Sequence, residues 1–183
     1  DRYTATLPGR SDVAGGPASV AGACSDENLD LIRQRLAEAI QQGIECMHRY
    51  GRPDLDVKLA HNYATRPFIF NCASCTDQAQ ITIWPNPTMP VVLTVCDEFF
   101  KGDANWQRST MFHEMEHLSE PPHDPTIEDQ AGDKNWEVDP IYACESMCFN
   151  SAATKCSCAT CLRSTKCNPR CASLAECDPE LGA

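Results

Sequence analysis

The sequence lacks any run of about 18 apolar residues, the length that a helix needs to cross a lipid bilayer. It also has few basic residues, because 15 Lys and Arg stand against 26 Asp and Glu, for a formal net charge of −11. We therefore expect no membrane-spanning segment. We also expect neither nucleic acid nor a membrane as a partner, because phosphate-rich surfaces repel this charge. The 183 residues suit one domain with a small appendage.

Cysteine, by contrast, is abundant, with 13 residues in the chain. Cytosolic proteins rarely carry so many, whereas exported proteins use them as disulfides. The sequence starts at Asp1, without Met and without an apolar leader, which fits the mature form of a secreted protein. We expect a secreted monomer in which the odd number leaves at least one cysteine outside intrachain disulfides.

Three helices are predicted. The clearest covers residues 25–49, where apolar residues recur at helical spacing and make one face. That face consists of Leu29, Ile32, Leu36, Ile40, Ile44 and Met47. A second helix is expected from about Asp103 through residues 110–118, and a third from about Tyr142 to Ala153. A long acidic loop rich in proline, residues 119–138, separates the last two.

Residues 55–100 have a different character and predict short strands, because β-branched and aromatic residues alternate with turn residues. The strands are expected at residues 57–60, 68–70, 81–84 and 91–95. The last of these precedes the second helix and is expected to form a ledge on which a peptide can lie. Helices and a small sheet together predict an α+β fold.

Three segments are distinguished along the chain. Residues 1–23 are rich in Gly and Pro and are read as an extended N-terminal arm. Residues 24–155 form the main domain, and residues 156–183 a cysteine-rich C-terminal appendage that disulfides must order. Cys144 and Cys148 lie one turn apart and are expected to join this tail to the last helix. Cys72 and Cys75 are also expected in structural disulfides.

The pattern His-Glu-x-x-His lies in the second predicted helix, as His113, Glu114 and His117. On a helix the two histidines lie one turn apart, with Cβ atoms about 5–6 Å from one another. Both imidazoles can then bind one zinc ion, and Glu114 can take a proton from the zinc-bound water that acts as nucleophile. The pattern therefore predicts a zinc site with a general base.

A catalytic zinc ion needs a third protein ligand, and the sequence leaves several candidates open. His123 gives the spacing of a metzincin, the family of zinc proteases in which a third histidine follows the pattern by this interval. That family has Gly three residues after the second His, where the chain turns sharply, whereas this chain has Glu120. The other candidates are Asp124, Glu128, Asp129, Asp133, Glu137, Asp139 and Glu145.

Asp139 is favoured because Asp139-x-x-Tyr142-Ala143 resembles a segment of the deuterolysin and peptidyl-Lys metalloendopeptidase group, the aspzincins. Residues 91–100 and 109–114 resemble that family's strand, its cysteine with aromatics, and its zinc helix. The likeness covers about residues 55–155 and implies a zincin-like fold and one zinc ion. It implies His113, His117 and Asp139 as metal ligands, Glu114 as general base, and Tyr142 as hydrogen-bond donor to the oxyanion.

The sequence thus predicts a secreted zinc endopeptidase that hydrolyses peptide or protein substrates. Two alternatives remain: a secreted zinc-binding or partner-binding protein on a peptidase scaffold, and a metzincin-type protease that uses His123. We expect an acidic surface near the site that favours basic residues in a substrate, and four acidic residues contribute to it. They are Glu116, Glu120, Asp124 and Glu128.

Overall fold

The computed structural model describes residues 24–50, 52–82, 88–120, 123, 135–149 and 153–163. Within them the fold is α+β, as predicted. The expected N-terminal arm, residues 1–23, lies outside the described part. The elements are α1 (Asp26–Tyr50), α2 (Pro53–Thr65), β1 (Phe68–Ala73), β2 (Ala79–Thr82), β3 (Val91–Cys96), the short 3-10 helix η1 (Asp97–Lys101), α3 (Ala104–Glu116), α5 (Asn135–Val138), α6 (Pro140–Phe149) and α7 (Lys155–Leu162).

The first predicted helix is confirmed as α1, and most of its apolar face is buried, with Ile32, Ile40 and Met47 fully so. The strand predicted over residues 57–60 is wrong, because these residues belong to α2. Pro53 stands in the first turn of α2, where its missing N–H does no harm. Val57 faces solvent and is 66% exposed, so its β-branched side chain is no sign of a buried strand.

The sheet has the strand order β1-β3-β2. β1 runs parallel to β3, and β2 pairs antiparallel with the other side of β3. The strands predicted over 68–70 and 91–95 lie within β1 and β3. The strand predicted over 81–84 overlaps β2 only at residues 81–82, because residues 83–87 lie outside the described part. β3 is therefore central, and β2 is an edge strand.

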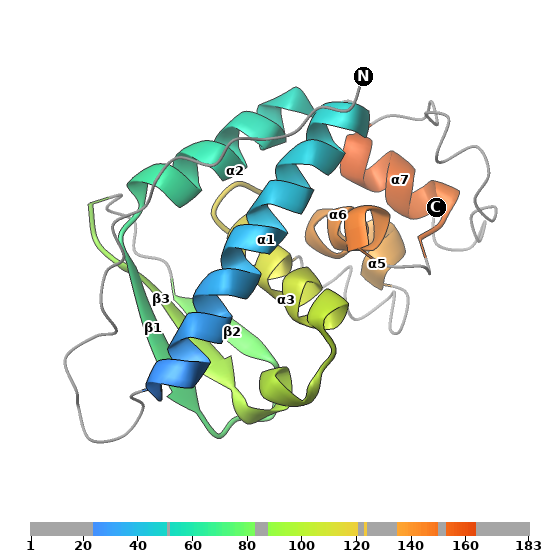
Figure 1. Cartoon of the computed structure of the whole chain (residues 1–183). Helices are drawn as coiled ribbons and strands as arrows, with labels where there is room; N and C mark the ends of the chain where they lie inside the picture. Colours follow the sequence, from blue (N-terminus) through green and yellow to red (C-terminus); the bar gives the residue numbers. More distant parts are fainter. Residues whose placement is uncertain are drawn as a thin grey trace.

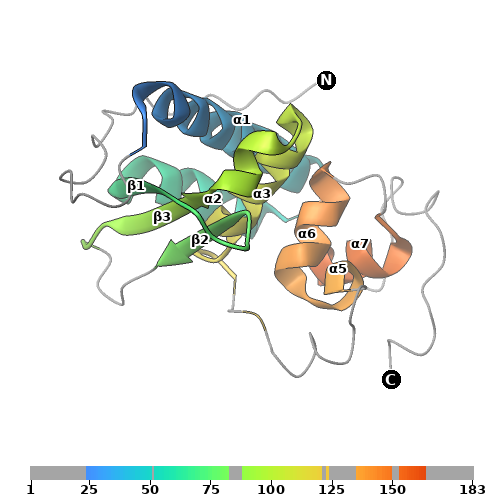
Figure 2. The same cartoon turned by 90° about the horizontal axis from the view of Figure 1, so that it is seen from below.

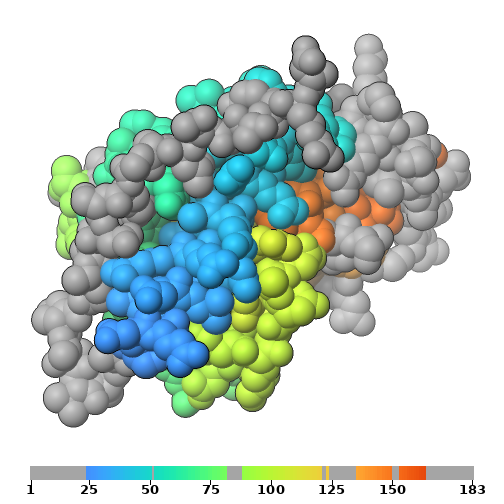
Figure 3. Space-filling model, in the orientation of Figure 1, coloured from blue at the N-terminus to red at the C-terminus, as the bar shows by residue number. Residues whose placement is uncertain are grey.

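Helix α3 carries the His-Glu-x-x-His pattern through the middle of the molecule. It begins where predicted, because the Asp103 side chain accepts a hydrogen bond of 2.9 Å from the Trp106 backbone N–H and caps the helix. α1 and α3 lie side by side (Figure 3), and Gly43 of α1 permits this: a Cβ there would lie 2.4 Å from the Phe112 ring. Figures 1 and 2 show α3 between the sheet and the group α5, α6 and α7.

Four disulfides link the described elements: Cys24–Cys72, Cys46–Cys148, Cys75–Cys96 and Cys144–Cys161. Cys144 joins α6 to α7, as expected for the tail, whereas Cys148 bonds to α1. The third predicted helix is α6, which starts two residues earlier and ends at Phe149.

Helix α7 crosses the domain boundary expected between residues 155 and 156, and it belongs to the hydrophobic core of the main domain, because Cys158 and Cys161 are fully buried there. No helix among the described residues is long and apolar enough to cross a membrane.

Candidate metal centre

Helix α3 places His113 and His117 one turn apart, as the pattern predicts, with ring centroids 5.1 Å from each other. His117 retains helical backbone angles at the end of the helix, so both rings project from the same face. They are partly buried between the helix and its neighbours.

His123 brings a third ring to the same place. Its Nε2 lies 3.2 Å from Nε2 of His113, and one ring nitrogen of each of His113, His117 and His123 lies within 4.8 Å of the others. Tetrahedral zinc with Zn–N bonds of about 2.0–2.1 Å requires ligand nitrogens about 3.3 Å apart. The separation of the first pair therefore fits the edge of such a tetrahedron, and the three histidines could together hold a metal ion.

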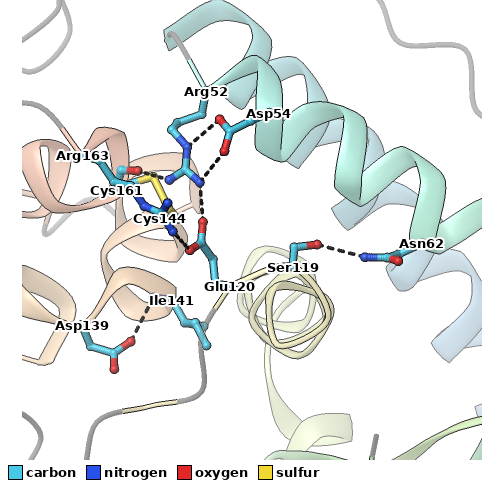
Figure 4. A network of polar contacts seen from close by, with 10 residues as sticks. All are labelled: Arg52, Asp54, Asn62, Ser119, Glu120, Asp139, Ile141, Cys144, Cys161 and Arg163. Carbon is cyan, nitrogen blue, oxygen red and sulfur yellow. Dashed lines mark hydrogen bonds and ion pairs between the residues drawn. A yellow bond between two sulfur atoms is a disulfide. The ribbon is translucent and has the colours of Figure 1, made fainter. Parts of the chain in front are cut away.

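Glu120 stands where the metzincin family has a glycine in a sharp turn, but it is not among the described residues of positive φ. Its N–H donates to the Glu116 carbonyl at 2.8 Å, and its buried carboxylate accepts from Arg52 and Arg163 (Figure 4). Two arginines thus hold the Glu120 side chain, and the backbone of this residue does not require a glycine.

Asp139 lies next to His123, but its carboxylate does not belong to the set of three ring nitrogens that lie within 4.8 Å of one another. Its Oδ2 is 2.9 Å from Nδ1 of His123, and its Oδ1 accepts the backbone N–H of Ile141 at 2.9 Å (Figure 4). The second contact caps the start of α6. Both oxygens of the carboxylate expected as third ligand therefore have a partner in this structure, and one of them contacts His123.

Glu145 supports His113 in the same manner. Its Oε2 lies 2.8 Å from Nδ1 of His113, and its Oε1 accepts a hydrogen bond from the Ser109 hydroxyl. Two of the three histidines therefore have a carboxylate at Nδ1. Carboxylates in this position are a regular feature of metal-binding histidines, because they fix the tautomer that leaves Nε2 free for the metal.

These contacts favour a cation between the rings. If Nδ1–H of His113 donates to Glu145 and Nδ1–H of His123 donates to Asp139, both Nε2 atoms carry lone pairs that face each other. Such a pair is repulsive unless a positive charge lies between them. The pKa of His113 also favours a positive charge here. Burial lowers this pKa, but the hydrogen bond and charge of Glu145 and the charges of Glu114 and Asp139 together raise it overall.

Tyr142 lies beside two of the three histidines. Its ring stacks on that of His123 with a centroid distance of 4.9 Å and an interplanar angle of 21°, and it lies 4.6 Å from the ring of His113. Asp139, Tyr142 and Glu145 are spaced three residues apart, so they share one face of α6. That face presents a carboxylate, a phenol and a second carboxylate to the histidines.

Glu114 is 6% exposed, and burial, the largest influence, raises its pKa to about 7. A carboxyl group with such a pKa can both accept and release a proton near neutral pH. Burial also lowers the pKa of His117 to about 4, helped by the charges of His113 and His123. His117 is therefore neutral at pH 7, which is the state that binds a metal.

Two cavities open beside the histidines. One of about 640 Å³ is lined by Asp77, Gln78, Trp106, Glu114, Tyr142 and Glu145, among others. The other, of about 510 Å³, is lined by residues 79–81 of the edge strand together with Glu114 and the three histidines. Both His113 and Glu114 line the two cavities.

Glu116 and Glu120 do not form the acidic surface that would attract basic substrates, because they are 0% and 6% exposed. Asp124 and Glu128 lie outside the described residues. Neither oxygen of Glu116 meets a hydrogen-bond partner in the described part of the chain. Burial, followed by the charges of Glu120 and Glu145, holds its pKa well above the usual range.

Replacing Glu116 with Met is therefore expected to stabilise the metal-free protein by about 1–3 kcal/mol at pH 5, the cost of an unpaired buried polar group. The gain should be larger at pH 8. Because folding raises the pKa of Glu116, its ionisation costs the folded state nothing below the unfolded pKa, and the folded state loses stability as the pH rises above that value. Thermal unfolding at both pH values measures the effect, and a Met variant less stable than wild type at pH 8 would contradict it.

The sequence pattern identified His113, Glu114 and His117, but Glu145 was only one of several candidate ligands. A signal for its role was present in its spacing of three and six residues from Tyr142 and Asp139, which places all three on one helix face.

Comparison with protein-family models, curated proteins and solved structures found no match. The assignment of the site therefore depends on its own geometry.

Proposed function

We propose that the protein is a secreted zinc-dependent endopeptidase that binds one zinc ion through His113, His117 and His123. The observation that carries the proposal is the convergence of three ring nitrogens beside the buried carboxyl group of Glu114. The aspzincin resemblance implied Asp139 as the third ligand, and the geometry favours His123 in its place. The disulfides are compatible with an extracellular protein.

Zinc held by three histidines supplies Lewis acidity, which polarises a carbonyl group and acidifies a water molecule. Glu114 takes the proton from that water and passes it to the amine that leaves, so the same carboxyl group serves as base and then as acid. Tyr142 lies against two of the ligand rings, and we propose that its phenol donates a hydrogen bond to the oxyanion.

The substrate peptide is proposed to lie along β2. We expected residues 91–95 to form the ledge, but β3 is central and pairs on both sides. β2 is one of the two edge strands, and its residues 79–81 line the cavity beside the histidines and Glu114. An extended peptide can add to such an edge through backbone hydrogen bonds, which would place its carbonyl groups beside Glu114.

A peptide library incubated with the zinc-loaded protein tests this function. We expect cleavage at internal peptide bonds that stops with a chelator and returns when zinc is added. If zinc binds but no peptide in the library is cleaved, the endopeptidase proposal fails, and the alternative of a zinc-binding protein on this scaffold takes its place.

A further inference from the structure

Glu145 connects α6 to two successive turns of α3. Its Oε1 accepts the hydroxyl hydrogen of Ser109, and its Oε2 lies 2.8 Å from Nδ1 of His113, which follows Ser109 by four residues. The Glu145 side chain is 21% exposed and that of His113 only 12%, so water competes little for this contact. Both carboxylate oxygens are thus committed to the helix that carries the zinc pattern.

The helix that carries Glu145 is firmly held. The neighbouring Cys144 bonds to Cys161 of α7, and Cys148 bonds to Cys46 of α1. The cap of α6 is Asp139, whose other oxygen contacts His123. A carboxylate on this helix therefore has a fixed position relative to both histidines.

We propose that Glu145 is a positioning residue that orients the His113 ring for metal binding, with Ser109 fixing the Glu145 carboxylate in turn. The inference depends on the proposed metal site at the three histidines. The Glu145 carboxylate selects the tautomer of His113 with hydrogen on Nδ1, which leaves the Nε2 lone pair for the metal and makes it more basic. Ser109 prevents the carboxylate from turning away, because its hydroxyl donates to the other oxygen.

A purely structural role for Glu145 would instead be a bridge between α3 and α6. Zinc affinity separates the two roles, because a bridge affects folding whereas a positioning residue affects the metal in the folded protein. Removal of such a carboxylate typically lowers metal affinity by about 10- to 100-fold. Gln keeps an oxygen acceptor for Nδ1–H but no charge, so it should restore part of the loss.

The experiment uses the full chain with its disulfides intact and measures zinc affinity by competition with a chromophoric chelator. Circular dichroism checks the fold of each variant. We expect Glu145→Ala to lower the zinc affinity by about 10- to 100-fold. The affinities of Glu145→Gln and Ser109→Ala should lie between that of Glu145→Ala and that of wild type. The matched control is Glu137→Gln. Glu137 is also buried, at 3% exposure, but it bonds to Thr154, so its replacement should leave zinc affinity within about twofold.

Folded Glu145→Ala protein with the zinc affinity of wild type would overturn the positioning role while leaving the metal site intact. If that variant does not fold, the Gln and Ser109→Ala variants decide: unchanged affinity in both overturns the role, and a graded loss supports it. Wild-type protein that takes up no zinc would instead refute the proposed function together with this inference. Zinc uptake without peptide cleavage would refute the peptidase activity alone.

Discussion

Replacing Glu114 with Gln is expected to abolish peptide hydrolysis while zinc stays bound. Gln has nearly the same shape but cannot accept the proton from water, so the variant loses the general base without losing a metal ligand. We expect a fall in kcat of about 100- to 10,000-fold, the usual contribution of a positioned acid–base group. Steady-state hydrolysis of a cleaved library peptide, with zinc content measured on the same sample, gives both results.

Glu98→Gln is the matched control for Glu114→Gln, because Glu98 is an exposed carboxylate of η1 whose contact is an ion pair with Lys101. Its replacement should leave hydrolysis unchanged. If zinc-loaded Glu114→Gln protein retained wild-type activity, Glu114 would not be the base, and the mechanism would be wrong.

The pH dependence of the wild-type protein follows from the same group. Glu114 must be ionised to act as base, so activity should fall as the pH drops through its pKa. Burial raises the pKa of Glu114 to about 7 in the metal-free protein. A zinc ion nearby favours the carboxylate, so the acidic limb of the rate profile should lie below this value. The residual activity that remains in the Gln variant after the fall in kcat should lack that limb.

Replacing His123 with Ala is expected to weaken zinc binding more than any change at Asp139. His123 supplies one of three convergent ring nitrogens, and its loss leaves only the two histidines of α3. Zinc affinity should drop by more than about 100-fold, beyond the range for a supporting carboxylate. Measurement by chelator competition on folded protein gives the comparison directly.

Asp139→Asn is the companion variant. Asn keeps an oxygen that can cap α6 and accept from Nδ1–H of His123, so the affinity should fall only modestly, within about tenfold. The aspzincin resemblance leads to the reverse order, because it makes Asp139 a ligand. Strong zinc binding in His123→Ala and none in Asp139→Asn would establish that reverse order.

Local patterns in the sequence predicted the elements whose formation depends on near neighbours. The apolar spacing in α1, the Asp103 cap of α3 and the interval between His113 and His117 all act within one or two helical turns. α2 was misread because Val57 and its neighbours were taken as strand residues, while its helical signal, apolar residues at 55, 59 and 63, was overlooked.

The sequence left His123 as an alternative ligand, because Glu120 stands where the metzincin family has a glycine. Arg52, 68 residues earlier, and Arg163, 43 residues later, bond the Glu120 carboxylate. The spacing of His113, His117 and His123 in the sequence does not reveal these partners. Asp139 was favoured as a ligand because of the aspzincin resemblance, and that resemblance does not reveal the contacts of its carboxylate with His123 and with the start of α6.

A crystal structure of the zinc-loaded protein, with anomalous scattering collected at the zinc edge, would locate the metal and its ligands. We expect one zinc ion bound by ring nitrogens of His113, His117 and His123, with Asp139 remaining on Nδ1 of His123. A zinc ion bound by the carboxylate of Asp139 with His123 turned away, or no zinc among these side chains at all, would contradict it.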